Sequence, residues 1–213
     1  MNEKVKKMTA TAMLCALAYL VTFIRIPVVL FLEYGPADII IALGGFIFGP
    51  LTALTISVVT ALIEMFTLSD TGWIGCLMNI ISTCSFVCIA SLIYKKMHSM
   101  KGAVIGLVTG VISMTCIMLL WNYLITPIYM GFPRAQVADM LIPYFLPYNL
   151  LKGGINATVT LLVYKPIVYG LRKAHLIPES KSLKNKNNLG IMISASAVLA
   201  TCIVVILAMR GII

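Results

Sequence analysis

The sequence predicts an all-α integral membrane protein, a bundle of six helices with one additional transmembrane helix at its C-terminal end. The composition indicates this class, because 61% of the 213 residues are hydrophobic and only 11% are charged. Soluble domains usually carry about 25% charged residues. The apolar residues also gather in runs near the length of about 20 residues that crosses a bilayer. We therefore expect the chain to fold in lipid.

Seven apolar runs are candidate membrane helices. They cover residues 8–24, 39–48, 51–66, 73–94, 103–124, 146–164 and 189–209. The first run follows three lysines, but it is longer than the apolar part of a signal peptide and lacks a small-residue cleavage site, so we interpret it as a retained helix. The second is too short to span alone, which is tolerated where neighbouring helices or a cavity satisfy its backbone. We expect this second segment to be irregular and to line a cavity.

The next four runs complete a six-helix membrane domain, residues 1–171. Residues 172–188, RKAHLIPESKSLKNKNN, are charged and polar without apolar periodicity, which predicts a cytoplasmic linker. Residues 189–213 contain the last apolar run, which carries no charge, and we interpret it as a peripheral transmembrane helix.

The distribution of basic residues favours a cytoplasmic N-terminus. With that orientation, the N-terminus and the inner loops hold most of the lysines and arginines behind the net charge of +9. This bias agrees with the positive-inside rule. The basic excess needs no nucleic-acid partner, because it is spread over these loops without interleaved aromatic residues.

Motifs for enzymatic chemistry are missing from the sequence. The glycine-rich stretch at residues 44–50, GGFIFGP, has proline where an ATP-binding loop needs lysine. No grouping of histidine, cysteine and carboxylate residues suggests hydrolysis, redox work or metal binding. We expect no enzyme and no cofactor, although a small membrane enzyme or a pore stays as an alternative, and the sequence shows no pore-forming repeat.

A small set of polar residues lies within the apolar runs, towards the outer side. They are Glu64, Asn79, Asn122, Asn149 and Lys152. A lysine at mid-span costs about 2.5–3.5 kcal/mol, so Lys152 is expected to face a cavity, a partner or water. Asn149 lies three residues earlier, on the same helical face. Alternatively, Lys152 extends to the headgroups and Asn149 caps the helix; the adjacent Gly153-Gly154 favours the cavity, since paired glycines allow close approach of backbone or ligand.

Aromatic residues also gather in the outer loops. They are Phe31, Tyr34, Phe132, Tyr144, Phe145 and Tyr148. Individually they are typical of an interfacial aromatic belt. Beside the amides and the lysine they would also suit a flat aromatic ligand.

Two ridges of small residues indicate close helix contacts. Gly102, Gly106 and Gly110 form one on the fifth run, where we expect packing within the bundle. Ala12 and Ala16 form the other on the first run, where the contact is either internal or with a partner.

Several of these motifs together resemble a known family. Besides the alanine ridge, they are YGPAD at residues 34–38, GGFIFGPLTAL at 44–54, NYLITPIYMG at 122–131 and PYNLLKGG at 147–154. The pattern is similar to the S component of energy-coupling factor (ECF) vitamin transporters, most closely the riboflavin-specific type, over about residues 4–172. The additional C-terminal helix departs from that family's usual six helices.

The resemblance implies a multi-pass protein of the bacterial cell membrane that binds riboflavin from outside. It would release the vitamin after docking with a transmembrane coupling protein and two ATPase subunits, which use the ATP. By the same resemblance, Asn122, Asn149 and Lys152 would hydrogen-bond the isoalloxazine edge. Ala12 and Ala16 would dock on the coupling protein.

A second hypothesis keeps the scaffold and changes the ligand. The side chains of Tyr34, Glu64 and Asn79 are further candidate substrate-binding groups, and they could redirect specificity towards another vitamin or a precursor.

Overall fold

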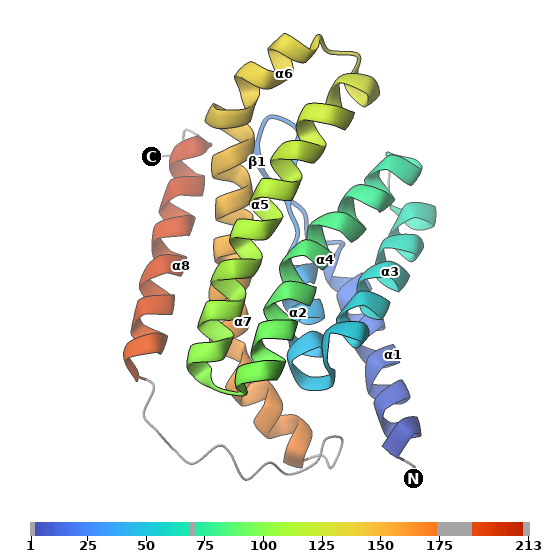
Figure 1. The fold of residues 1–213 in the computed structure, drawn as a ribbon, viewed down its shortest axis with the longest axis vertical. Helices are drawn as coiled ribbons and strands as arrows, with labels where there is room; N and C mark the ends of the chain where they lie inside the picture. Colours follow the sequence, from blue (N-terminus) through green and yellow to red (C-terminus); the bar gives the residue numbers. More distant parts are fainter. Residues whose placement is uncertain (1–2, 69–70, 174–188, 211–213) are drawn as a thin grey trace.

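The structure is a computed structural model that describes residues 3–68, 71–173 and 189–210 (Figure 1). The helices and strands in chain order are α1 (Glu3–Val21), β1 (Ile26–Val29), β2 (Leu32–Tyr34), α2 (Ala37–Phe48), α3 (Pro50–Thr67), α4 (Gly72–Met97), α5 (Met100–Met130), α6 (Arg134–Met140), the π-helical turn η1 (Leu141–Phe145), α7 (Leu146–Lys173) and α8 (Leu189–Met209). The predicted fold class, a helical membrane bundle with one further helix, is confirmed.

Four of the described helices, α3, α4, α5 and α8, are long and apolar enough to cross a bilayer by length and composition. The others fall short for local reasons. The α1 helix begins with charged residues, α2 has only 12 residues, and α7 carries asparagines and a lysine among its apolar residues. The α5 helix is longer than the predicted 103–124, because it begins at Met100, continues through Pro127 and ends at Met130, where Gly131 follows in a left-handed conformation.

A short antiparallel hairpin follows α1 and was not predicted. Its strands β1 and β2 pair Ile26 with Tyr34 and Pro27 with Glu33. Figure 1 shows the hairpin and α6 at the same end of the bundle, opposite the N-terminus. We call this end the hairpin end.

The α4 and α5 helices pack closely along the glycine ridge. A Cβ atom on Gly106 would lie 2.6 Å from the Ala90 carbonyl oxygen, and one on Gly110 would lie 2.5 Å from the Phe86 carbonyl oxygen. Only glycine permits this approach of the two backbones. The interpretation of the glycine ridge as packing within the bundle is confirmed.

The half of the bundle away from the hairpin end is filled by apolar and aromatic side chains. Phe46 stacks on Tyr94 with ring centroids 4.6 Å apart, and the hydroxyl oxygens of Tyr94 and Tyr164 lie 2.6 Å apart. Most of the main hydrophobic cluster belongs to α2, α4, α5 and α7. Open space is therefore left towards the hairpin end.

The Gly153-Gly154 pair faces neighbouring helices: the expected close approach is to α5 and α8, and the alternative of a role beside a ligand is wrong. A Cβ on Gly153 would meet the Val111 side chain of α5 at 2.8 Å, and one on Gly154 would meet the Cys202 sulfur of α8 at 3.3 Å. These glycines let α5 and α8 approach α7. Which helical face is packed depends on the neighbours, which the spacing of residues within α7 does not specify.

The α8 helix lies beside α7 at the periphery of the bundle (Figure 1). Cys202 packs in a small cluster with Val28 and Tyr34 of the hairpin and with Leu151 and Ile155 of α7. The rest of α8 is largely exposed. Residues 174–188, most of the predicted linker, lie outside the described residues, and the division of the chain at 171 and 188 remains a prediction.

Candidate ligand-binding site

A cavity of about 500 Å³ lies at the hairpin end of the bundle. Its wall is built by the segment that follows α1, by the hairpin, and by residues of α2, α3, α4, α5 and α7. The volume is within the roughly 300–1,000 Å³ of small-molecule sites. The short α2 contributes Ala37, Asp38 and Ile41 to the wall, as expected. The expected irregularity of this segment is wrong, because α2 is a regular helix of 12 residues that ends at the Gly49-Pro50 break.

Asp38, in the first turn of α2, is the centre of a buried polar network. Its Oδ1 accepts a hydrogen bond from the Thr83 hydroxyl at 2.6 Å, and its Oδ2 accepts one from the Asn156 amide at 3.1 Å. The Lys152 Nζ lies 3.6 Å from Oδ2. A carboxylate that is only 4% exposed is tolerated because it is paired and hydrogen-bonded, and the helix N-terminus also favours its charge.

This network decides between the two interpretations of Lys152 and Asn149. The ammonium group of Lys152 lies in the cavity wall against Asp38 and does not extend away from the bundle. Asn149 lies inside a continuous helical segment that runs from α6 through η1 into α7. Its side chain therefore does not cap a helix N-terminus.

Tyr34 supports the same network from behind the cavity wall. Its hydroxyl donates to the Asn156 Oδ1 at 2.9 Å, which ties the hairpin to α7. Burial, reinforced by the negative charge of Asp38, raises the pKa of the Tyr34 phenol above its usual range. The phenol therefore stays protonated as a donor. Tyr34 does not line the cavity, whereas Glu64, Asn79, Asn122 and Lys152 do.

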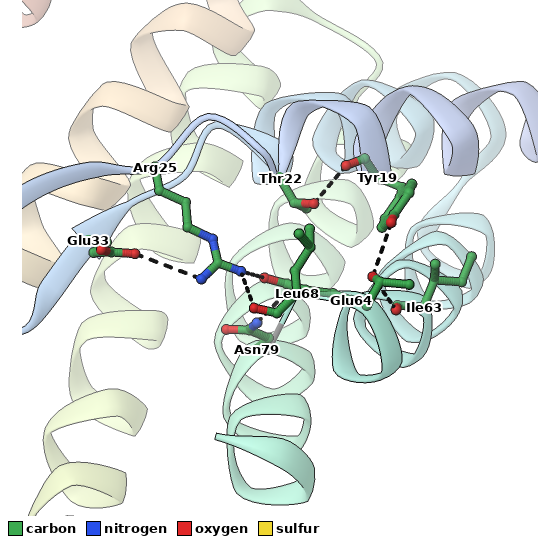
Figure 2. Close-up of polar contacts among 9 residues, drawn as sticks. Tyr19, Thr22, Arg25, Glu33, Ile63, Glu64, Leu68 and Asn79 are labelled. Atoms are coloured by element: carbon green, nitrogen blue, oxygen red, sulfur yellow. Dashed lines mark hydrogen bonds and ion pairs between the residues drawn. The ribbon is translucent and has the colours of Figure 1, made fainter. Parts of the chain in front are cut away.

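Arg25 is the centre of a second cluster of polar side chains beside the cavity, shown in Figure 2. Its Nη2 donates to the Glu64 Oε1 at 3.1 Å and to the Leu68 carbonyl at 3.3 Å. Its Nη1 lies 3.9 Å from the Glu33 carboxylate. Asn79 donates to the other Glu64 oxygen at 3.1 Å. The predicted residues Glu64 and Asn79 are thus brought together, and both Glu64 oxygens are hydrogen-bonded.

Aromatic side chains line one part of the cavity. They are Phe31 of the hairpin, Trp121 and Tyr129 of α5, and Tyr148 of α7. The Tyr148 hydroxyl donates to the Glu33 carbonyl and so fixes its ring. Of the remaining predicted aromatics, Phe145 is fully buried outside the cavity lining, and Phe132 and Tyr144 are exposed.

The two predicted amides of α5 and α7 take different positions. Asn122 lines the cavity; its amide donates to the Met118 carbonyl at 2.7 Å, and its oxygen accepts from Thr126 at 3.0 Å. Asn149 lines an adjoining recess of about 50 Å³ that also touches Lys152. Its amide donates to the Phe145 carbonyl at 2.7 Å. Each amide nitrogen keeps one hydrogen for a further acceptor.

Sequence reasoning missed three residues of these networks. Arg25 lies between the first two apolar runs and Asp38 just before the second, where charges are ordinary. Asn156 was overlooked, although Asn149, Lys152 and Asn156 follow one another at three- and four-residue spacing, which places them on one helical face. That spacing was the available signal.

The alanine ridge of α1 faces outwards. Ala12 and Ala16 are exposed, whereas Cys15 and Ala18 on the same helix are buried in the core. The ridge is therefore accessible to a partner or to lipid, and docking of a coupling protein there stays a prediction.

Comparison with known proteins relates the chain to transporters. Residues 6–164 match the family model for the substrate-specific component of the ECF transporter. The chain is 29% identical over 178 residues to the riboflavin transporter RibU of Staphylococcus aureus (strain TCH60), covering 79% of this chain and 93% of that protein. It is 26% identical over 190 residues to the riboflavin transporter FmnP of Bacillus subtilis (strain 168), covering 81% and 99%.

A solved structure shares the fold. The S component of a bacterial ECF transporter superposes with a TM-score of 0.68 at 27% identity, covering 79% of this chain and 99% of that chain. The family match covers α1 to most of α7 and leaves α8 outside.

Proposed function

The chain belongs to the family of substrate-specific components of ECF transporters, and we propose that its ligand is riboflavin, captured at the outer face of a bacterial cell membrane. The relatives described above are named as riboflavin transporters, and they align over nearly their whole length. Their similarity supports the same ligand for this chain.

The chemistry of the cavity supports riboflavin as well. The vitamin has a flat ring system, a uracil-like edge with hydrogen-bond acceptors and a donor, and a chain of hydroxyl groups. The aromatic residues of α5, α7 and the hairpin suit the ring system. Lys152 and the amides of Asn122 and Asn149 suit the polar edge. The observation that carries the proposal is this combination of an intramembrane lysine with aromatic walls in one cavity.

The energy for import would come from partner subunits. The chain has no ATP-binding loop of its own, and the ECF system supplies a transmembrane coupling protein and two ATPase subunits. The exposed alanines of α1 are the proposed docking surface for the coupling protein. The positive-inside rule supports a cytoplasmic N-terminus, which puts the hairpin end and the cavity on the outer side.

Uptake of labelled riboflavin tests this function. The chain would be expressed with a coupling protein and two ATPase subunits in bacterial cells that lack their own riboflavin import. We expect ATP-dependent uptake that needs the chain and that unlabelled riboflavin abolishes. A cell line with an inactive ATPase is the control. If the cells take up no labelled riboflavin but take up another labelled vitamin only when the chain is present, that vitamin is the ligand of the same scaffold.

A further inference from the structure

The α8 helix lies outside the family match, and it packs on the bundle with one defined face. Its buried residues, Ala195 and Cys202, lie about two helical turns apart. The buried or partly buried residues of this face are Ala195, Leu199, Cys202, Ile206 and Met209. They follow one another at three- and four-residue spacing, which places them on one side of the helix. Ile203 and Val204, which come directly after Cys202, are exposed.

The hairpin contacts this face of α8 on one side and the cavity on another. Val28 of β1 and Tyr34 of β2 are buried in a cluster with Cys202, and Leu199 and Ile206 pack against that cluster. Neither Val28 nor Tyr34 is among the residues that line the cavity. The hairpin residues that do line it include Phe31, Leu32 and Glu33. The α8 helix thus supports the hairpin from outside the cavity.

The hairpin needs such support because it is small. Its strands have four and three residues, and an isolated two-stranded hairpin is at best marginally stable. Hydrogen bonds fix it at two points on α7, where Tyr148 donates to the Glu33 carbonyl and Tyr34 donates to Asn156. The apolar part of its attachment is the cluster that it shares with α7 and α8. Loss of the α8 contacts would therefore loosen the hairpin and leave these hydrogen bonds in place.

Close packing holds α8 against α7. The helix carries no charged residue, and helices associate in lipid through van der Waals contact between well-fitted surfaces. Gly154 of α7 permits that contact, since a Cβ there would lie 3.3 Å from the Cys202 sulfur. Figure 1 shows that α8 runs along α7 with its C-terminal end towards the hairpin end. Shortening the side chains on the packed face of α8 should therefore weaken its support of the hairpin.

We propose that α8 is a brace that holds the hairpin against α7 and thereby slows the passage of the ligand into and out of the cavity. The effect on passage rests on the proposed function, whereas the brace itself does not. Among the described residues, α8 contributes none to the cavity wall, so it makes no contact with the ligand. A brace that stabilises the hairpin equally with and without ligand slows entry and exit by the same factor. The dissociation constant then stays unchanged.

Hydrogen exchange of the ligand-free protein tests the brace. The test variant Leu199→Ala/Ile206→Ala, made in the full-length chain, shortens two side chains on the packed face. The control Ile203→Ala/Val204→Ala shortens two exposed side chains on the same helix. We expect the amides of residues 26–34 to exchange about three- to tenfold faster in the test variant, because local opening becomes easier, and at the wild-type rate in the control. Unchanged exchange along the contact of α4 with α5 shows that the bundle stays folded.

Riboflavin kinetics with the same two variants test the effect on passage. Association would be followed by quenching of flavin fluorescence, and release by chasing bound labelled riboflavin with an excess of the unlabelled vitamin. We expect both rates to rise about three- to tenfold in the test variant and the dissociation constant to stay within about twofold of the wild type. The control should match the wild type in all three quantities.

The outcomes separate the brace from the proposed function. Hairpin exchange that rises equally in both variants, or in neither, would overturn the brace. Faster hairpin exchange with unchanged flavin rates, or with a changed dissociation constant, would overturn its control of passage. If the folded wild-type protein binds no riboflavin, the proposed function fails, and the hairpin exchange still decides the brace.

Discussion

The ion pair between Lys152 and Asp38 allows a quantitative test of the cavity wall. Lys152→Met removes the ammonium group and keeps a long apolar side chain. Asp38 then keeps its hydrogen bonds from Thr83 and Asn156 but loses its countercharge. Asp38→Asn has the converse effect, and the double variant removes both charges together.

The distance between the two charges sets the expected loss of stability. Two unit charges 3.6 Å apart attract each other by roughly 4–5 kcal/mol at an effective dielectric constant of about 20. Removing one partner of a buried pair typically costs about 3–5 kcal/mol. We expect each single variant to lower the free energy of unfolding by about 3 kcal/mol, since the remaining group keeps some partners. The double variant should cost about 2–3 kcal/mol less than the sum.

The assay is denaturant unfolding of the full-length protein in detergent, followed by tryptophan fluorescence. Lys173→Met, at the exposed end of the same helix, is the matched control and should change nothing. Additive losses in the two single variants would refute the pairing.

The same Lys152→Met protein should bind riboflavin about ten- to a hundredfold more weakly, because a hydrogen bond to a charged group contributes about 1.5–3 kcal/mol. Wild-type affinity would mean that the lysine does not touch the ligand.

Four further outcomes are expected. Ala12→Trp or Ala16→Trp should abolish cellular uptake and leave flavin binding to the isolated protein intact, because both alanines face outwards; equal loss of both would refute the docking surface. Deleting residues 178–213 should preserve binding, since no described α8 residue lines the cavity; a truncated protein that neither inserts nor binds would place α8 in the core. Asn149→Leu should weaken binding less than Lys152→Met, by about two- to tenfold, and a larger loss by titration would contradict a neutral hydrogen bond. Gly106→Leu should prevent folding, because its Cβ would overlap the α4 backbone; a normal gel-filtration profile would contradict that packing.

The helices could be predicted because their signal is local. Lipid requires long apolar runs, and the predicted bounds of α2, α3 and α8 agree with the structure within two residues. The hairpin could not be predicted in this way, because its strands have four and three residues. Such short strands carry no clear alternation, and their pairing depends on a turn at Leu30, whose positive φ of 52° is unusual for leucine.

The site could be predicted only where polarity is unusual. Lys152, Asn122 and Glu64 stand out within apolar helices, because burying them in lipid is costly. Asp38 lies at a helix start and Arg25 in a loop, where charges are common, so only the three-dimensional contacts reveal their partners.

Titration of the purified, folded wild-type protein with riboflavin tests the central claim most directly. The cavity places Trp121 and Tyr148 in its wall, so a stacked flavin should lose its fluorescence on binding. We predict quenching with a sharp end point at one flavin per chain, reversed by excess unlabelled riboflavin and not by an unrelated vitamin. Unquenched fluorescence at saturating concentrations of riboflavin, with the protein still folded, would contradict the assignment of this cavity as a riboflavin site.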